Sequence, residues 1–188
     1  MSTSTALMTA EELLQLPRGE FRHELINGEL ITMPLPGTPH GRITARIMAP
    51  LAQFIWENDL GEVYAEAGFK LTVNPDTVLG PDITFVSKHR LQEAGDVKGY
   101  WPGPPDLAVE VLSPSDRPSM VRTRISRLFG YGVKQLWIVN PKDHTVTVHR
   151  SLSDSQTFSG SDHLSADDIL PGFRISLNRI FSKSSQEK

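Results

Sequence analysis

The sequence contains no cysteine, which excludes zinc–thiolate centres, iron–sulfur clusters and catalysis by a thiol. It also lacks any apolar run that approaches the ~18 residues of a membrane-spanning helix. The first ten residues have neither the positively charged start nor the apolar stretch of a secretory signal. We therefore expect a cytoplasmic protein that does not insert into a membrane.

An excess of positive charge is absent as well. The chain has 19 Lys and Arg residues against 22 Asp and Glu residues, a net charge of -3, which argues against a general binder of polyanions. The motifs G-x-x-x-x-G-K-[ST], G-x-S-x-G and H-E-x-x-H do not occur, nor does G-x-G-x-x-G after a predicted strand. P-loop hydrolysis, dinucleotide redox chemistry and serine-hydrolase chemistry therefore lose their usual support.

The length of 188 residues predicts one domain, which we place at residues 9–181 between ends, 1–8 and 182–188, that we expect to be disordered. Capping residues or apolar residues at helical spacing predict helices over 9–17, 40–58 (kinked at Pro50) and 115–131. Apolar runs or alternation predict strands over 21–33 (a hairpin around Asn27-Gly28), 63–73, 82–86, 107–112, 135–139 and 145–150.

The remaining segments are predicted from their turn residues. Pro, Gly and charged residues dominate 88–105, so we expect a surface loop there with a short helix at 91–94. The closing stretch, 170–181, predicts a turn, a strand and a last packing segment. Because helices and strands are interleaved, the pattern indicates an α/β or α+β fold with a mixed sheet flanked by helices.

Two acidic residues stand out because they lie at or within apolar strands. Glu110 interrupts the run Leu107–Leu112, and Asp82 begins the strand 82–86. A buried carboxylate must meet a cation, a hydrogen-bond donor or a proton, because an unpaired buried charge costs several kcal/mol. If these strands are neighbours, the two acids can converge and hold Mg²⁺ or Mn²⁺, which prefer oxygen ligands. The alternative is structural: Glu110 pairs with an arginine and Asp82 caps a turn.

The predicted helix after Glu110 offers such an arginine. At about 100° per residue, Ile125, Leu128 and Phe129 form an apolar stripe, and Arg124 borders it. Arg124 could stabilise a phosphate, or it could simply pair with Glu110. The segment from Arg117 to Lys134 contains no acid, so its basic residues could offer a local surface to a nucleic acid.

Other polar residues permit both a functional and a structural interpretation. His40, at the start of a predicted helix, could orient a substrate, transfer a proton or serve as an ordinary polar cap. Glu24 and Glu29, which flank the hairpin turn, could add a carboxylate to a metal site or be solvated. Lys70 lies on the polar face of the predicted strand with Glu66, where an ion pair is the simpler interpretation.

Five stretches occur in an order that resembles the Uma-two family, a bacterial family of restriction-endonuclease-like proteins within the PD-(D/E)XK nuclease superfamily. They are HELINGEL (23–30), GPDITFV (80–86), PDLAVEVLSPSDR (105–117), GYGVKQLWIVNP (130–141) and LPGF (170–173). The resemblance extends over about residues 9–181. It implies a restriction-endonuclease-like mixed sheet flanked by helices, with an N-terminal β-hairpin.

The resemblance also implies roles for single residues. Asp82 and Glu110 match the two metal-binding acids of the family, with the backbone carbonyl of Val111 as a third ligand for Mg²⁺ or Mn²⁺. Glu24 matches a recurrent acid of the first hairpin, and His40 a recurrent histidine. The chain is thereby expected to be an endonuclease that hydrolyses DNA phosphodiester bonds and forms a homodimer.

The sequence departs from the family at its catalytic lysine. Leu112 stands at the superfamily position, and Arg124 stands at the helical position, eight residues before Gly132, to which the lysine usually migrates in this family. An arginine supplies a fixed positive charge but cannot lose its proton near neutral pH, so it cannot act as a general base. Lys70 is a candidate substitute. The alternative function is a catalytically impaired nuclease-fold module that binds nucleic acid or protein.

Overall fold

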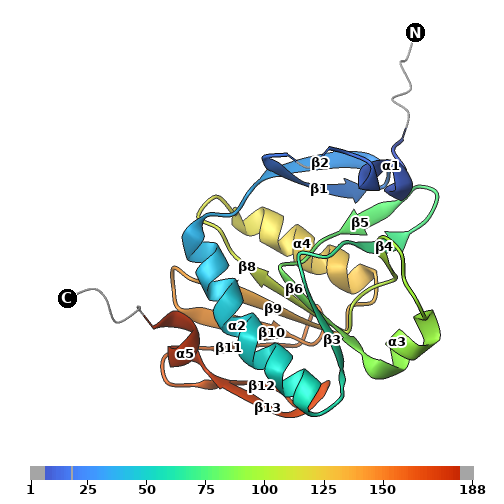
Figure 1. Cartoon of the computed structure of the whole chain (residues 1–188). Helices are drawn as coiled ribbons and strands as arrows, with labels where there is room; N and C mark the ends of the chain where they lie inside the picture. The colour runs from blue at the N-terminus through green and yellow to red at the C-terminus, as the bar shows by residue number, and fades with distance from the viewer. Residues whose placement is uncertain (1–6, 18, 183–188) are drawn as a thin grey trace.

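A computed structural model describes residues 7–17 and 19–182 (Figure 1). The helices in this part of the chain are α1 (Ala10–Leu14), α2 (Thr38–Glu57), α3 (Lys88–Ala94), α4 (Pro118–Gly130) and α5 (Leu177–Phe181). The strands there are β1 (Phe21–Ile26), β2 (Glu29–Pro34), β3 (Gly61–Ala65), β4 (Phe69–Thr72), β5 (Thr77–Leu79), β6 (Ile83–Ser87), β7 (Trp101–Pro102), β8 (Leu107–Val111), β9 (Gln135–Asn140), β10 (Thr145–His149), β11 (Ser155–Phe158), β12 (His163–Ala166) and β13 (Leu170–Ser176).

The strands form two larger sheets and a hairpin. A six-stranded sheet has the order β11-β10-β9-β8-β6-β3, and a five-stranded sheet has the order β2-β1-β5-β4-β7. The strands β8 and β9 are parallel, whereas the other neighbours in the six-stranded sheet are antiparallel. The strands β12 and β13 pair separately. The prediction of a mixed sheet flanked by helices is confirmed.

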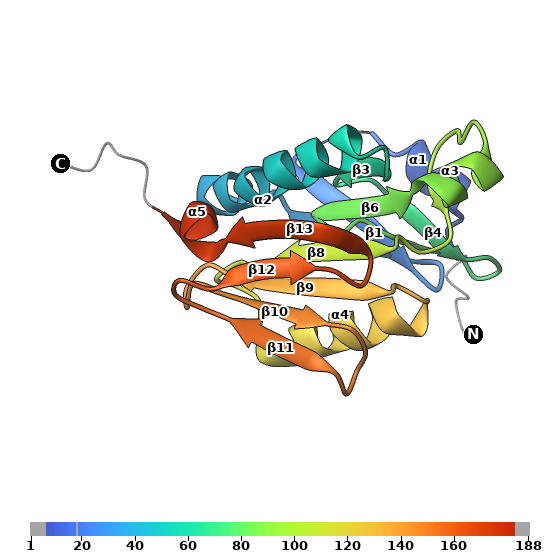
Figure 2. The ribbon, with the colours of Figure 1, turned by 90° about the horizontal axis from the view of Figure 1, so that it is seen from below.

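Helices cover both faces of the six-stranded sheet, with α2 on one side and α4 on the other (Figures 1 and 2). Alternation along β8 explains this arrangement: Val109 faces the core under α2, whereas Ala108 faces the smaller core under α4. Leu128 of α4 and Leu79 of β5 also belong to the smaller core. Glu110 therefore lies on the same face of β8 as Ala108, toward α4.

The N-terminal hairpin is confirmed. Six pairs join β1 and β2 antiparallel, from Phe21 opposite Pro34 to Ile26 opposite Glu29. The turn places Asn27 at φ 50° and Gly28 at φ 79°, the left-handed backbone that a two-residue type I′ turn requires. Asparagine and glycine tolerate this region better than other residues, so the local sequence determines the register of the hairpin.

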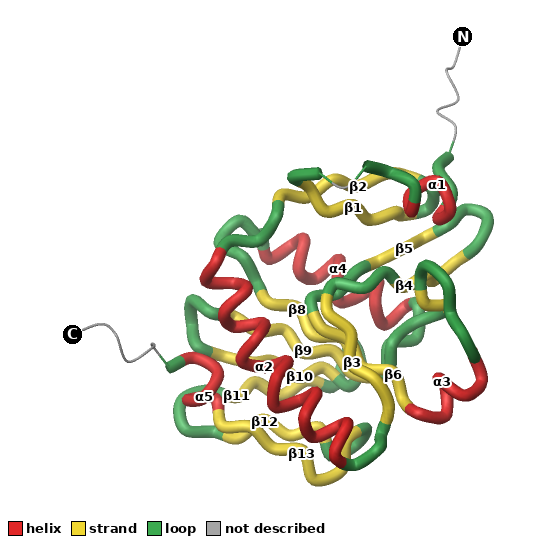
Figure 3. Tube along the Cα trace, in the orientation of Figure 1, coloured by secondary structure: helices red, strands yellow, loops and turns green. Residues whose placement is uncertain are grey.

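The prediction of one strand over 63–73 is wrong. Figure 3 shows β3 and β4 as separate strands, and they belong to different sheets. Glu66 has a φ of 50°, which ends the extended backbone, and a Cβ on Gly68 would lie 2.2 Å from the ring of Tyr100. The apolar alternation continues across the break, although each strand fully buries a single residue, Val63 in β3 and Phe69 in β4.

Several boundaries also differ from the prediction. The helix within the predicted loop 88–105 begins at Lys88, and the short β7 follows it. The N-cap of α4 is Arg117, whereas Asp116 accepts a hydrogen bond of 2.7 Å from the Ser113 backbone. The strands β5, β11 and β12 were not predicted. The helix α2 continues through Pro50.

The predicted disordered ends fall largely outside the described residues, at 1–6 and 183–188. Met8 donates a backbone hydrogen bond of 2.9 Å to Gly28, and Ser182 donates one of 2.9 Å to Asn178. In the described ranges, no helix is both long and apolar enough to cross a membrane.

Candidate functional site

Asp82 and Glu110 meet because β6 and β8 are antiparallel neighbours. Ile83 pairs with Val109 and Thr84 pairs with Ala108, so the same register, continued by one residue, sets Asp82 opposite Glu110. The backbone N–H of Val111 donates a hydrogen bond of 2.7 Å to Asp82 Oδ2. The two acids and the backbone next to Glu110 are thus brought together.

Asp82 is buried among donors. Arg22 Nη1 donates to Asp82 Oδ1 at 3.1 Å, and His40 Nε2 lies 3.1 Å from Oδ2. Burial raises the pKa of Asp82, but the hydrogen bonds from His40 and the Val111 backbone outweigh this effect and lower it. The carboxylate is therefore held in its ionised form.

Arg22 belongs to the site although the sequence analysis did not identify it. Its Nη2 donates to the Gly80 carbonyl at 2.7 Å, and its Nη1 lies 3.7 Å from Glu66. Arg22 and Glu24 are two residues apart on β1, so their side chains lie on one face of the strand. Because Glu24 was already a candidate site residue, this spacing could have identified Arg22 from the sequence.

Arg124 links two carboxylates from different strands. Its Nε donates to Glu110 Oε1 at 2.8 Å, while Nη1 and Nη2 donate to the two carboxylate oxygens of Glu24 at 2.6 and 2.8 Å. The Gly80 backbone N–H adds a hydrogen bond of 2.7 Å to Glu24. The structural interpretation of Arg124 as a partner of Glu110 is confirmed, and Glu24 is the second partner.

The ion pairs of Arg124 and the burial of the cluster shift the pKa values of Glu110 and Arg124 in opposite directions. Burial raises the pKa of Glu110 to about 7, although the charge of Arg124 acts to lower it. Burial lowers the pKa of Arg124, but the charges of Glu110 and Glu24 outweigh this effect and raise it. Arg124 is therefore permanently cationic, whereas Glu110 is easier to protonate than an ordinary glutamate.

His40 contacts Asp82 and lies near the backbone of Val111. The hydrogen bond that His40 donates to Asp82 raises the pKa of His40, burial lowers it, and an interaction with the Val111 backbone raises it further. Thr44 Oγ1 is 3.5 Å from the other ring nitrogen. A hollow of about 350 Å³ adjoins this end of α2 and is lined by Thr38, Pro39 and Arg42.

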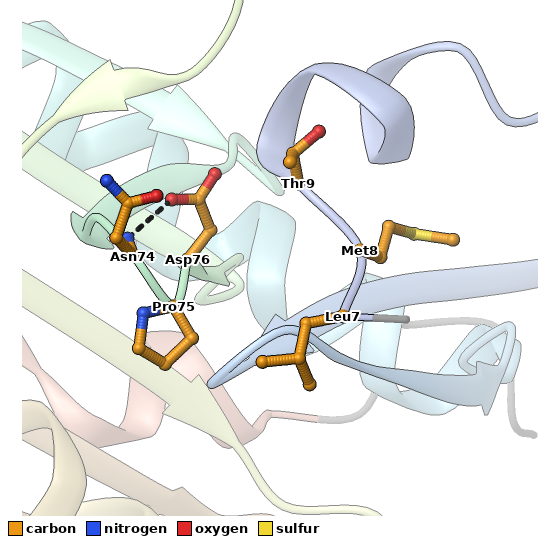
Figure 4. A pocket seen from close by; sticks show the side chains of 6 residues that line it. All are labelled: Leu7, Met8, Thr9, Asn74, Pro75 and Asp76. Carbon is orange, nitrogen blue, oxygen red and sulfur yellow. Dashed lines mark hydrogen bonds between the residues drawn. The ribbon is translucent and has the colours of Figure 1, made fainter. Parts of the chain in front are cut away.

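Lys70 is not brought to this cluster. Its Nζ lies 3.0 Å from Glu11 and 3.0 Å from Asp76, and Asp76 also accepts a hydrogen bond of 2.8 Å from the Ala10 backbone. The expected pairing with Glu66 is not formed, because Glu66 faces Arg22. A pocket of about 280 Å³ lies nearby, where residues 7–9 meet 74–76 (Figure 4). Lys70 thus anchors α1.

The basic residues between Arg117 and Lys134 do not form one free surface. Arg124 is occupied by Glu24 and Glu110, and Lys134 lies 2.6 Å from Asp106. At about 100° per residue, Arg127 lies about 60° from Arg124 around α4, whereas Arg122 lies about 160° away. Within residues 7–17 and 19–182, neither Arg122 nor Arg127 forms an ion pair.

The donor set fits a hard divalent cation in type but is small. In the described part of the chain, no group of three or more His, Asp and Glu side chains is arranged to hold a metal. Glu24 has both oxygens on Arg124. The remaining candidates are Asp82, Glu110 and the backbone of Val111. Both Asp82 oxygens already accept hydrogen bonds, whereas no hydrogen bond from another described residue reaches Glu110 Oε2. Two carboxylates and a carbonyl fit Mg²⁺ or Mn²⁺, which usually retain several waters.

Comparisons with known proteins support the fold. A solved structure described as "a putative nuclease belonging to DUF820 from Anabaena variabilis" matches with a TM-score of 0.79 and 23% sequence identity, covering 93% of this chain and 98% of that one. No protein of curated function matches the sequence. A family model, Uma2, described as "Putative restriction endonuclease", matches residues 10–178. The chain belongs to this family.

Proposed function

We propose that the protein is a Mg²⁺- or Mn²⁺-dependent endonuclease that hydrolyses DNA phosphodiester bonds. The observation that carries this proposal is the register of β6 and β8, which sets Asp82 opposite Glu110 with the backbone of Val111 against Asp82. Asp82, Glu110 and the Val111 carbonyl would hold the metal. The family description and the fold support the same class of reaction.

A bound divalent cation would supply positive charge that stabilises a reacting phosphate and makes a nearby water more acidic. The residues of the chain then have separate tasks. Arg22 and His40 keep Asp82 ionised and oriented, because each places a donor 3.1 Å from one of its oxygens. Arg124 supplies a fixed positive charge that can stabilise a phosphate but cannot accept a proton.

The expected partners follow from the same reaction. On the side of α4 that carries Arg124, Arg127 offers a positive charge to a DNA phosphate. A homodimer would allow both strands of a duplex to be cut by symmetry-related sites. DNA as the substrate, the homodimer and a cytoplasmic location are parts of this proposal.

Calorimetric titration of Mn²⁺ and Mg²⁺ tests the metal site without a guess about the DNA sequence. We expect binding by the wild type and loss of binding in Asp82→Ala and Glu110→Ala, with Asp168→Ala, an acid exposed to solvent, as the matched control. Incubation of the same proteins with supercoiled plasmid and metal then tests cleavage.

One observation favours the alternative function, a nuclease-fold module that has lost catalysis. Arg124 already supplies positive charge to Glu24 and Glu110, so the fold does not require a metal to compensate these acids. Metal binding without plasmid cleavage, together with retained DNA binding, would support the module. Cleavage that depends on both Asp82 and Glu110 would refute it.

A further inference from the structure

We infer that Arg124 is the internal counter-cation of this acidic site and that it sets the affinity for divalent metal by competing with the metal for Glu110. The inference rests on the proposed metal site at Asp82 and Glu110. It adds an affinity-determining role for a residue that would not be a metal ligand itself.

The geometry shows how Arg124 is held. All three of its guanidinium nitrogens donate to carboxylate oxygens, at 2.8 Å to Glu110 and at 2.6 and 2.8 Å to Glu24. The side chain of Arg124 is 19% exposed, and those of Glu24 and Glu110 are 5% and 16% exposed. A planar, forked cation between two half-buried or buried carboxylates has little reason to leave its position while both remain ionised.

The charges of the cluster explain why a metal would meet competition. Three carboxylates, Glu24, Asp82 and Glu110, face two permanent cations, Arg22 and Arg124, so most of the negative charge is already compensated. A divalent cation at Asp82 and Glu110 would lie close to the guanidinium that now binds Glu110. Repulsion between like charges at such distances is large in a site with little water.

A metal ion can therefore bind both oxygens of Glu110 only if the hydrogen bond from Arg124 Nε to Glu110 weakens or breaks. Glu24 holds the other end of the guanidinium through two hydrogen bonds, so Arg124 can release Glu110 and remain attached to β1. At a pH at which Glu24 and Glu110 both remain ionised, removal of the guanidinium should leave two uncompensated carboxylates and a site that attracts a divalent cation more strongly.

Calorimetric titration of Mn²⁺ tests this expectation in three proteins. We expect Arg124→Met to bind Mn²⁺ with a Kd lower by about tenfold or more than the wild type, because an opposing charge is gone. Arg122→Met is the matched control, because Arg122 lies on the same helix but on its other side, and its Kd should equal that of the wild type. If Arg124→Met does not fold, Arg124→Lys keeps the charge but loses the fork that holds Glu24 and Glu110 together, so it should compete less well for Glu110 and bind Mn²⁺ more tightly than the wild type, by less than is expected of Arg124→Met.

The wild-type protein offers a second measurement that needs no destabilised variant. The Nε–H of Arg124 is hydrogen-bonded to Glu110, so its proton NMR signal should be protected from exchange and assignable by its loss in Arg124→Lys. Addition of Mg²⁺ should shift or remove this signal with the same concentration dependence as metal binding. Asp82→Ala should abolish that response.

The outcomes separate the inference from the proposed function. Wild-type binding that depends on Asp82, with an unchanged Kd in the Arg124 variants and an undisturbed Nε–H signal, would overturn the inference and leave the metal site in place. Failure of the folded wild type and of all folded variants to bind Mn²⁺ would overturn both. Tighter binding in an Arg124 variant, combined with a response of the Nε–H signal, would establish the competition.

Discussion

Glu24 and Arg124 are 100 residues apart in the sequence, yet their side chains form a two-pronged ion pair with distances of 2.6 and 2.8 Å. The pair joins β1 of the five-stranded sheet to α4, which covers the six-stranded sheet. Because Arg124 also binds Glu110, the same contact connects the N-terminal hairpin to the candidate metal site. The stability of the fold and the chemistry of the site are therefore coupled through one guanidinium.

Breaking this pair from the carboxylate side should be strongly destabilising. We expect Glu24→Ala to lower the free energy of unfolding by about 3–5 kcal/mol, because a buried arginine loses its main partner. Glu29→Ala, on the exposed strand of the same hairpin, should change it by less than about 0.5 kcal/mol. Urea unfolding of both variants measures the difference, and equal effects would show that Glu24 contributes no more than a surface acid.

How much of this site could be predicted depends on the range of the interactions. Asp82 and Glu110 are identifiable because each is a carboxylate in or beside an apolar strand, and the pairing of those strands brings them together. Of the two partners of Arg124, Glu110 was predicted and Glu24 was not. The sequence indicates a helix face bordering the core, but it does not say that β1 approaches that face from another sheet.

The fold shows the same limit. The hairpin at Asn27-Gly28 was predictable because two adjacent residues determine the turn. The break between β3 and β4 was not predictable, because Glu66 adopts a left-handed backbone that is not typical of glutamate. In that case β3 pairs with β6, and β4 pairs with β5, so the two segments lie in different sheets although one apolar alternation extends through both.

Asp106 should make the stability of the protein depend on pH in the acid range. Burial raises the pKa of Asp106, but hydrogen bonds from Lys134 and the Ser87 backbone, with the charge of Arg90, outweigh burial and lower it. A lowered folded-state pKa means that the stabilisation is complete above the unfolded value, near 3.8, and is lost as pH falls through the folded value.

We therefore expect Asp106→Asn to be less stable than the wild type at pH 7 and the two proteins to converge as pH falls below about 3.8. Urea unfolding at a series of pH values checks this prediction. Asp96→Asn, whose side chain is exposed and forms no ion pair with another described residue, controls for general effects of charge. A difference between wild type and Asp106→Asn that stays constant down to the lowest pH would contradict the assignment.

Lys70 should prove to be an anchor for α1 and not part of the metal site. In Lys70→Met, Asp76 loses a cation at 3.0 Å but keeps its hydrogen bond to the Ala10 backbone. We expect a loss of about 1–3 kcal/mol in the free energy of unfolding, the cost of leaving a buried acceptor less satisfied. The Kd for Mn²⁺ should be unchanged. A lower metal affinity without loss of stability would instead place Lys70 in the site.

DNA binding should depend on Arg127 but not on Arg122, because the two residues lie on different sides of α4. If DNA approaches the side of α4 that carries Arg124, Arg127 contacts a phosphate and Arg122, about 160° away from Arg124, does not. The logarithm of the binding constant should fall linearly with the logarithm of salt concentration, because phosphate contacts release counterions. Arg127→Ala should reduce the magnitude of that slope by about 1, whereas Arg122→Ala should leave it unchanged.

Fluorescence anisotropy of labelled duplex DNA over a series of salt concentrations, without divalent metal, measures both slopes. Equal slopes in the two variants would mean that DNA does not bind along this side of the helix, and a slope near zero in the wild type would argue against phosphate recognition altogether.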